Sequence, residues 1–277
     1  MTRPDTDKTS LFTFARRWNA VSAAAAALAI LSLLTLGCSL LGDKTSNENA
    51  ANVGAPEASP EASVKEETAS GPCANEYYPI DPGVKKVYKS TSSIAGTNTE
   101  ITLSQSAPEG DTFTEMRTLT SGTTVKTPWK CTPEGLRIAE YQNVIDASKA
   151  RFKMETVESS GTTVPSTWNV GEEWGSDYKV NVKLNAGPVN TNATGTVKIK
   201  EKLVSKNDKV TVPGGTYDAA KVESMISITI TYGGRKIPSP DVKLIRWYAP
   251  GVGLVKQQVT NDVYGNETIE YAGPAGS

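Results

Sequence analysis

The 277-residue sequence contains no histidine. Histidine is the commonest general base and the commonest metal ligand, so its absence excludes Ser-His-Asp and Cys-His catalysis. The sequence also lacks a nucleophile elbow, a nucleotide-binding loop and a calcium loop, and it has too few thiols for a zinc site. We therefore expect no enzyme, no cofactor and no metal. Carboxylates that meet only in the fold, as in glycoside hydrolases, remain the catalytic alternative, and Glu172-Glu173 is the one adjacent pair in the domain.

A charge excess of either sign is also lacking. The chain has 29 basic and 30 acidic residues, which gives a formal net charge of -1. Proteins that bind nucleic acid usually carry a clear basic excess. The balance therefore predicts no nucleic-acid partner.

Charged residues are missing from residues 18–42, and the apolar core at 21–36 follows Arg16 and Arg17. This order is typical of a signal peptide. The segment ends in LTLGC, which resembles the lipobox of bacterial lipoproteins, so we expect an export signal at 1–37 and a lipidated Cys38 that anchors the chain to a membrane. An uncleaved membrane helix is the alternative. Ser39 follows the cysteine directly, and by analogy with envelope lipoproteins this residue favours sorting of the protein to the outer membrane.

Cysteine is scarce, with only Cys38, Cys73 and Cys131. An odd number of cysteines in an exported protein implies that one thiol is special. The exported domain is expected to face the periplasm or the exterior, which are oxidising compartments. Once Cys38 is modified, Cys73 and Cys131 are the remaining thiols, so we predict a disulfide between them.

Residues 38–71 contain no aromatic residue and are rich in Ala, Ser, Glu and Pro. Such a composition buries too little apolar area to fold, so we expect a disordered tether. From residue 72 to 277 the pattern changes to short alternating runs separated by Gly, Pro and Asn, which predicts strands with one wet face. Only residues 142–153 are ambiguous between strand and helix.

About a dozen strands are expected, near residues 84–93, 99–104, 113–120, 122–129, 135–141, 150–158, 178–185, 196–203, 226–232, 242–249, 253–260 and 266–271. A sheet with so many strands must curl. We predict an all-β domain with a strongly curved antiparallel sheet, a half-barrel or open barrel, and few or no helices.

Four blocks pair a turn-forming Gly or Pro with an aromatic residue: YYPIDPG at 77–83, WNVGEEW at 168–174, VPGGTYDA at 212–219 with Lys221 and Val222, and WYAPGVGLVK at 247–256. With them the chain resembles an uncharacterised family of bacterial secreted proteins and lipoproteins with half-barrel domains, similar in form to the lipoprotein-localisation factors. The resemblance implies a bent antiparallel sheet whose concave side is apolar. In the localisation factors that concavity holds acyl chains.

A cavity is therefore predicted inside the sheet. Its candidate lining residues are inward-facing aliphatics of limited bulk, namely Val180, Val182, Ile226, Ile228 and Ile230. The functional expectation is a cell-envelope lipoprotein that binds a lipid or another apolar ligand. A scaffold or assembly lipoprotein that contacts other envelope proteins is the alternative.

Two further groups of residues have an ordinary structural interpretation. Trp168, Trp174, Trp247 and Tyr248 could line a pocket, but aromatic residues near strand ends are more often part of a core. The row formed by Lys198, Lys200 and Lys202 is better explained as a solvated strand face than as a phosphate site.

Overall fold

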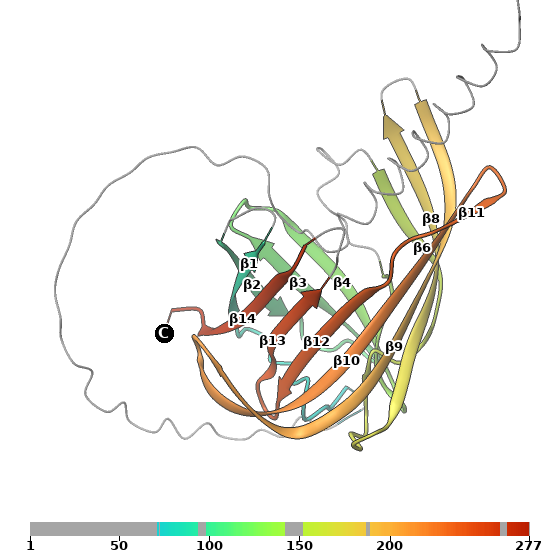
Figure 1. Cartoon of the computed structure of the whole chain (residues 1–277). Helices are drawn as coiled ribbons and strands as arrows, with labels where there is room; N and C mark the ends of the chain where they lie inside the picture. The colour runs from blue at the N-terminus through green and yellow to red at the C-terminus, as the bar shows by residue number, and fades with distance from the viewer. Residues whose placement is uncertain are drawn as a thin grey trace, which may run out of the picture.

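The computed structural model describes residues 71, 73–93, 98–141, 152–186, 189–260 and 265–276. All regular elements in these residues are β-strands that form one curved antiparallel sheet, which confirms the predicted fold class (Figure 1). No helix in the described part of the chain is long and apolar enough to cross a membrane. The predicted signal, Cys38 and most of the tether lie outside the described residues, as do 142–151 of the ambiguous stretch.

The strands are β1 Lys86–Ser92, β2 Asn98–Gln105, β3 Thr112–Leu119, β4 Thr124–Thr132, β5 Gly135–Ile138, β6 Phe152–Gly161, β7 Val164–Pro165, β8 Glu173–Ala186, β9 Val189–Val212, β10 Gly215–Tyr232, β11 Arg235–Pro238, β12 Val242–Ala249, β13 Gly253–Thr260 and β14 Glu267–Pro274. Each predicted strand overlaps one of them. Two were not predicted: β7 is too short to show alternation, and β11 is largely exposed and polar.

The strand order is β6-β8-β9-β10-β12-β13-β14-β1-β2-β3-β4-β5-β7, with β11 paired to β10. The two strands at the ends of this path, β6 and β7, follow one another in the chain. The curvature of the sheet therefore brings the two end strands of this path close to each other. The first and last strands, β1 and β14, pair directly near the middle of the path.

The long hairpin of β9 and β10 extends from one side of the sheet to the other. Its pairing shifts register near Ala219 and Lys221, and such β-bulges bend strands. Beyond the bulge the tip of the hairpin reaches β14, where the backbone N–H of Gly214 donates to the carbonyl of Tyr271 at 3.0 Å. A side chain at Gly214 would lie 2.9 Å from the backbone of Gly273, so this approach requires glycine.

Buried residues form three hydrophobic clusters. The first lies on β8, β9, β10, β12 and β13 and includes Tyr178, Val197 and Leu244. The second contains the disulfide, Trp129 and Trp168, and the third packs the hairpin tip onto β13 and β14. The inward residues of each strand recur at every second position, so they lie on one face of the pleated sheet.

Residues 73–85 precede the first strand and are named the cap segment. Hydrogen bonds connect the cap segment to distant elements: the side-chain nitrogen of Asn75 donates to the carbonyl of Pro165 at 2.8 Å, and Gly251 donates to the carbonyl of Glu76 at 2.9 Å. Asp81 donates its backbone N–H to Gln105 at 3.2 Å. The cap segment therefore joins β7, β2 and the β12–β13 turn.

Candidate ligand-binding cavity

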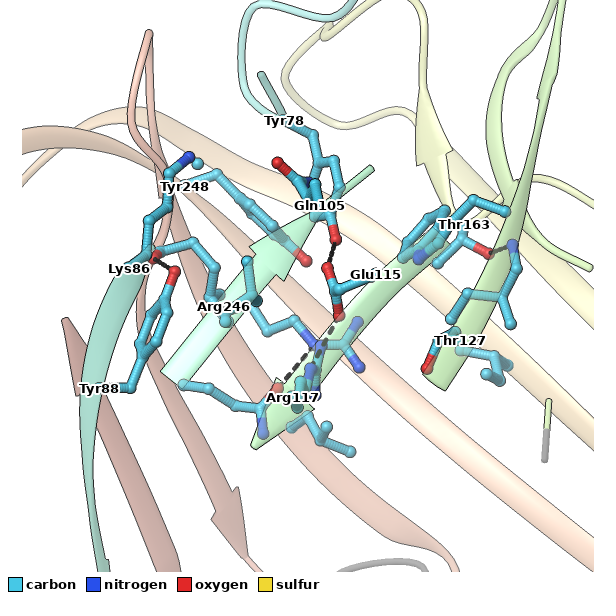
Figure 2. A pocket seen from close by; sticks show the side chains of 18 of the residues that line it. Tyr78, Lys86, Tyr88, Gln105, Glu115, Arg117, Thr127, Thr163, Arg246 and Tyr248 are labelled. Atoms are coloured by element: carbon cyan, nitrogen blue, oxygen red, sulfur yellow. Dashed lines mark hydrogen bonds and ion pairs between the residues drawn. The ribbon is translucent and has the colours of Figure 1, made fainter. Parts of the chain in front are cut away.

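A cavity of about 210 Å³ lies where the three hydrophobic clusters meet. Figure 2 shows its side chains, which come from strands on both sides of the curved sheet and from the cap segment. Part of the lining is apolar, with contributions from Leu103, Ile138, Ile199, Ile226 and Leu244. The rest is polar or charged, which distinguishes this cavity from an ordinary gap in a hydrophobic core.

One wall has a polar row on neighbouring strands, named the β2–β4 row. Gln105, Glu115 and Thr127 lie side by side in the pairing of β2, β3 and β4, and all three are buried. The Tyr78 hydroxyl of the cap segment donates to one oxygen of Glu115, and Nε of Arg117 donates to the other at 2.8 Å. The cap segment is therefore bound to the cavity wall through a buried carboxylate.

The opposite wall has a second polar row, named the β8–β13 row, and it contains Trp174, Glu201, Ser224, Arg246 and Gln257. Pairing places Trp174 opposite Glu201, Glu201 opposite Ser224, and Arg246 opposite Gln257. Glu201 accepts hydrogen bonds from the Trp174 indole at 2.9 Å, Ser224 at 3.1 Å and Arg246 at 2.7 Å. Nε of Arg246 donates to Gln257 at 3.1 Å.

Burial changes the acid–base properties of these groups. Burial raises the pKa of Glu201, although Arg246 and the donors from Ser224 and Trp174 oppose the change. The charge of Glu115 raises the pKa of Arg117. Burial alone would lower the pKa of Arg246, but Tyr248 and Glu201 bring it above its ordinary value. Both arginines therefore stay cationic inside the cavity.

The charged groups differ in their access to the cavity. The side chain of Glu115 is 0% exposed and that of Glu201 is 1% exposed, whereas the side chain of Arg117 is 45% exposed. Arg117 lies on the same face of β3 as Glu115 and belongs to the lining of the cavity (Figure 2). The cavity therefore presents a cation to solvent and keeps its two wall carboxylates covered.

Sequence reasoning missed these residues, although a signal was available. On β3, Glu115 and Arg117 lie between Phe113 and Leu119 on the same inward face. The same pattern occurs on β9, where Glu201 lies between Ile199 and Leu203, and on β12, where Arg246 lies between Leu244 and Tyr248. A charge within an apolar alternation on three strands indicates a polar interior.

The five predicted lining residues have different positions. Ile226 lines the cavity. The other four, Val180, Val182, Ile228 and Ile230, belong to the first hydrophobic cluster and pack against its other members, and they are not among the lining residues. Their small branched side chains fill space together with Tyr178, Val197 and Leu244, so this end of the concave face is packed.

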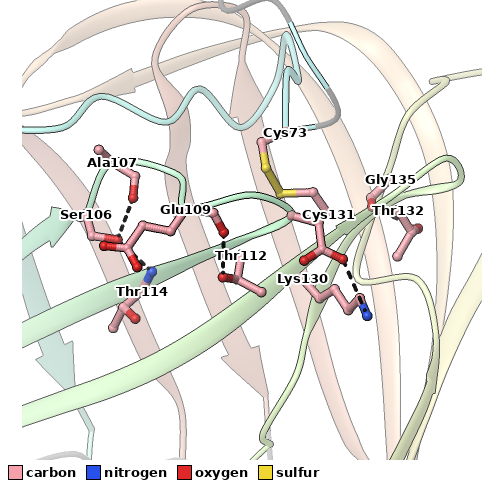
Figure 3. The surroundings of a disulfide bond; sticks show 11 residues. Cys73, Ser106, Ala107, Glu109, Thr112, Thr114, Lys130, Cys131, Thr132 and Gly135 are labelled. Atoms are coloured by element: carbon pink, nitrogen blue, oxygen red, sulfur yellow. Dashed lines mark hydrogen bonds and ion pairs between the residues drawn. A yellow bond between two sulfur atoms is a disulfide. The ribbon is translucent and has the colours of Figure 1, made fainter.

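Cys73 and Cys131 are joined by a disulfide with a Cα–Cα distance of 5.0 Å (Figure 3). The bond connects the start of the cap segment to β4, and both cysteines are buried in the second cluster. It therefore limits how far Tyr78 can move from Glu115. The predicted lipidation site, Cys38, lies outside the described residues.

The remaining candidates from the sequence have structural roles in the described residues. Trp168 is buried and packs on Tyr77 with ring centroids 4.5 Å apart, and the Trp247 indole donates to Asp208 at 3.3 Å. Trp174 belongs to the β8–β13 row, and Tyr248 lines the cavity.

Charged candidates lie on the outer face of the sheet. Lys198, Lys200 and Lys202 are exposed, and Lys202 pairs with Glu173 at 3.1 Å. Glu172 is exposed in the turn before β8, where it accepts a hydrogen bond from Asn169. Neither Glu172 nor Glu173 lines the cavity.

The fold and the cavity together define an all-β half-barrel domain with a charged interior. Residues 126–263, from β4 to just past β13, match the model of the DUF3108-like family, so this segment is similar to proteins of that family. No curated protein matches the chain.

Two solved structures are similar in outline. One is a candidate exported protein with a YmcC-like fold from Bacteroides fragilis, with 12% identity, a TM-score of 0.45 and coverage of 73% of this chain and 99% of that one. The other is a candidate lipoprotein from Parabacteroides distasonis, with 16% identity, the same TM-score and the same coverage. Neither of these matches names the lipoprotein-localisation factors, so that resemblance stays a prediction.

Proposed function

We propose that this protein is an exported lipoprotein of the cell envelope whose half-barrel binds a small amphiphilic ligand. The observation that carries the proposal is the cavity, which is partly open to solvent and combines an apolar side with two polar rows. Ligand sites are typically concave and mostly apolar, with a few convergent polar groups. The lipobox-like sequence ending in Cys38 supports the anchor, and Ser39 supports the outer membrane as its location.

The size of the cavity limits the ligand. A dry cavity of about 150 Å³ is known to bind benzene, so about 210 Å³ accommodates a ring or a short acyl segment together with a small polar group. A long acyl chain would extend beyond this volume. The proposed ligand is therefore compact, or only its end enters the cavity.

Binding is favoured over the two alternatives. For catalysis, the chain supplies no histidine, and Glu115 and Glu201 are engaged by internal donors. A scaffold would need an exposed apolar patch. The exposed large hydrophobic residues of the described part are few, namely Val84, Val157, Val170, Val204 and Tyr232.

The test is native mass spectrometry of the full-length protein purified from membranes, with analysis of bound small molecules. We expect a bound compound in the wild type and its loss in Ile226→Trp, because the larger side chain fills the cavity. Val204→Trp, at a site that is 37% exposed, is the matched control and retains the compound. If nothing co-purifies and no small aromatic or short-chain compound raises the melting temperature, the proposed function is wrong.

A further inference from the structure

In the two polar rows, both carboxylates already accept hydrogen bonds, whereas some of the donor groups have no acceptor in the described residues. Both oxygens of Glu115 accept hydrogen bonds, from Tyr78 and Arg117. Both oxygens of Glu201 also accept, one from Arg246 and Ser224 and the other from Trp174. Glu115 and Glu201 are covered as well as engaged, so they are not accessible to a ligand.

Donor capacity remains. Arg117 uses Nε for Glu115, and no described residue accepts a hydrogen bond from its two terminal nitrogens. The indole N–H of Trp129, which also belongs to the lining, is buried without a partner in the described structure. Within the described residues, Arg137 and Trp168 also have buried unpaired donors and lie outside the lining, so the terminal nitrogens of Arg117 carry the argument for an acceptor on the ligand.

Arg117 is held in place before a ligand arrives. Its Nε is bound to Glu115, which is itself bound to Tyr78 of the cap segment, and the disulfide attaches this segment to β4. A fixed guanidinium presents its terminal N–H groups as a planar fork that matches a carboxylate. The charge of Arg246 is close enough to oppose that of Arg117, so a bound anion would relieve repulsion between the two cations.

The number of charged side chains in the cavity lining does not by itself favour an anionic ligand. The lining has three cationic side chains, from Lys86, Arg117 and Arg246, and three acidic ones, from Glu115, Glu140 and Glu201. Glu115 and Glu201 are covered, and Lys86 is already paired with Asp81 at 2.8 Å. The exposed charges of the lining are those of Arg117 and Glu140. Arg117 is therefore the exposed cation of the lining, and ligands of opposite charge test whether it or Glu140 selects the ligand.

We infer that the ligand is a small organic anion whose carboxylate binds the terminal nitrogens of Arg117 and whose apolar part contacts Ile199, Ile226 and Leu244. This inference rests on the proposed function and specifies its ligand class. A neutral amide could also accept hydrogen bonds, so the test compares ligands of one shape and different charge.

The experiment is isothermal titration of the full-length protein with benzoate, benzamide and benzylamine. We expect benzoate to bind at least about tenfold more tightly than benzamide, because a hydrogen bond between two charged groups is stronger than one with a neutral group. Benzylamine should not bind. Arg117→Gln should remove the preference for benzoate and leave benzamide binding unchanged. Arg235→Gln, on the exposed β10–β11 turn, is the matched control.

Arg117→Gln leaves Glu115 buried without its cation, so a second variant guards against misfolding. Glu115→Gln with Arg117→Gln removes both charges and keeps an acceptor for Tyr78, and it should show the same loss of preference. If benzoate and benzamide bind the wild type equally, or if both variants keep the preference, the anion inference is wrong while the binding function stands. If none of the three compounds binds and nothing co-purifies, the proposed function itself fails.

Discussion

At the scale of single residues, the unusual feature is a set of charges inside a β-sheet. Removing an ion from water is unfavourable, and a buried pair offsets this only when its remaining hydrogen-bonding groups are also satisfied. Glu201 meets that condition with three donors from three strands. The side chain of Glu201 therefore connects β9 to β12, in addition to β8 and β10, with which β9 pairs directly.

Replacement of Glu201 by alanine should be strongly destabilising. The change leaves Arg246, whose side chain is 15% exposed, without its carboxylate. Loss of one member of a buried pair typically lowers the free energy of unfolding by about 3–5 kcal/mol. Denaturant unfolding measures this change. Glu173→Ala removes an exposed pair with Lys202 and should alter stability by less than about 1 kcal/mol. Similar losses in the two variants would contradict the role given to the β8–β13 row.

The buried tyrosines predict instability in alkali. Burial raises the pKa of Tyr141 from 10.0 to about 12, and it also raises the pKa values of Tyr88 and Tyr248. Above pH 10 the unfolded chain ionises its phenols while the folded chain keeps Tyr141 neutral. The stabilisation is therefore complete below pH 10 and is lost as the pH rises through 10 to about 12, by at most about 3 kcal/mol for Tyr141.

Denaturant midpoints across that pH range, with phenolate absorbance as a second probe, check this expectation. Tyr141→Phe removes one titrating group and should flatten the decline. Tyr232→Phe, at a position that is 44% exposed, should leave the decline as it is in the wild type. Identical declines in all three proteins would show that Tyr141 is not the group responsible.

At the scale of elements, the cap segment and β4 form a unit through the disulfide. The two cysteines are separated by 58 positions in the sequence, and the chain-entropy model gives a stabilisation of about 4 kcal/mol for a loop of that length. Cys73→Ala with Cys131→Ala should lower the free energy of unfolding by an amount of that order. Because the disulfide helps to hold the cap segment and its Tyr78 against Glu115, the backbone amides of residues 73–85 should exchange hydrogen faster in the variant.

Thiol titration of the denatured, unreduced protein gives a direct control. We expect no reaction at Cys73 and Cys131 in the wild type. Free thiols at both positions, or equal unfolding midpoints with and without reductant, would be inconsistent with the bond.

Elements were easier to predict than the contacts between them. Alternation located most of the strands because a half-buried strand repeats every two residues. Alternation cannot say which strands pair. The row that joins Trp174, Glu201 and Arg246 depends on register across four strands, and the sequence contains no local trace of that register. Ile226 was predicted to line the cavity, but the contacts among the charged lining residues were found only in the structure.

At the scale of the whole molecule, the domain is expected to be attached to a membrane through Cys38. The prediction is that Cys38→Ala abolishes incorporation of a fatty-acid analogue and releases the protein into the soluble fraction. Both cysteines of the disulfide lie in the half-barrel domain, so the bond should still form in this variant. If the Cys38→Ala variant stays labelled, the lipid is attached elsewhere. If it loses the label but stays with the membrane, the amino-terminal segment remains as a membrane helix.

The pairing of β1 with β14 has a consequence for how the chain folds. Lys89 lies opposite Glu270, and the two are separated by most of the domain, so the sheet cannot be completed until the last strand is available. Contacts between distant residues slow folding because a long loop must close first. Until β14 arrives, β1 and β13 each have an unpaired edge, and such edges promote aggregation. A chain truncated before residue 267 should therefore accumulate as a chaperone substrate instead of a smaller folded domain.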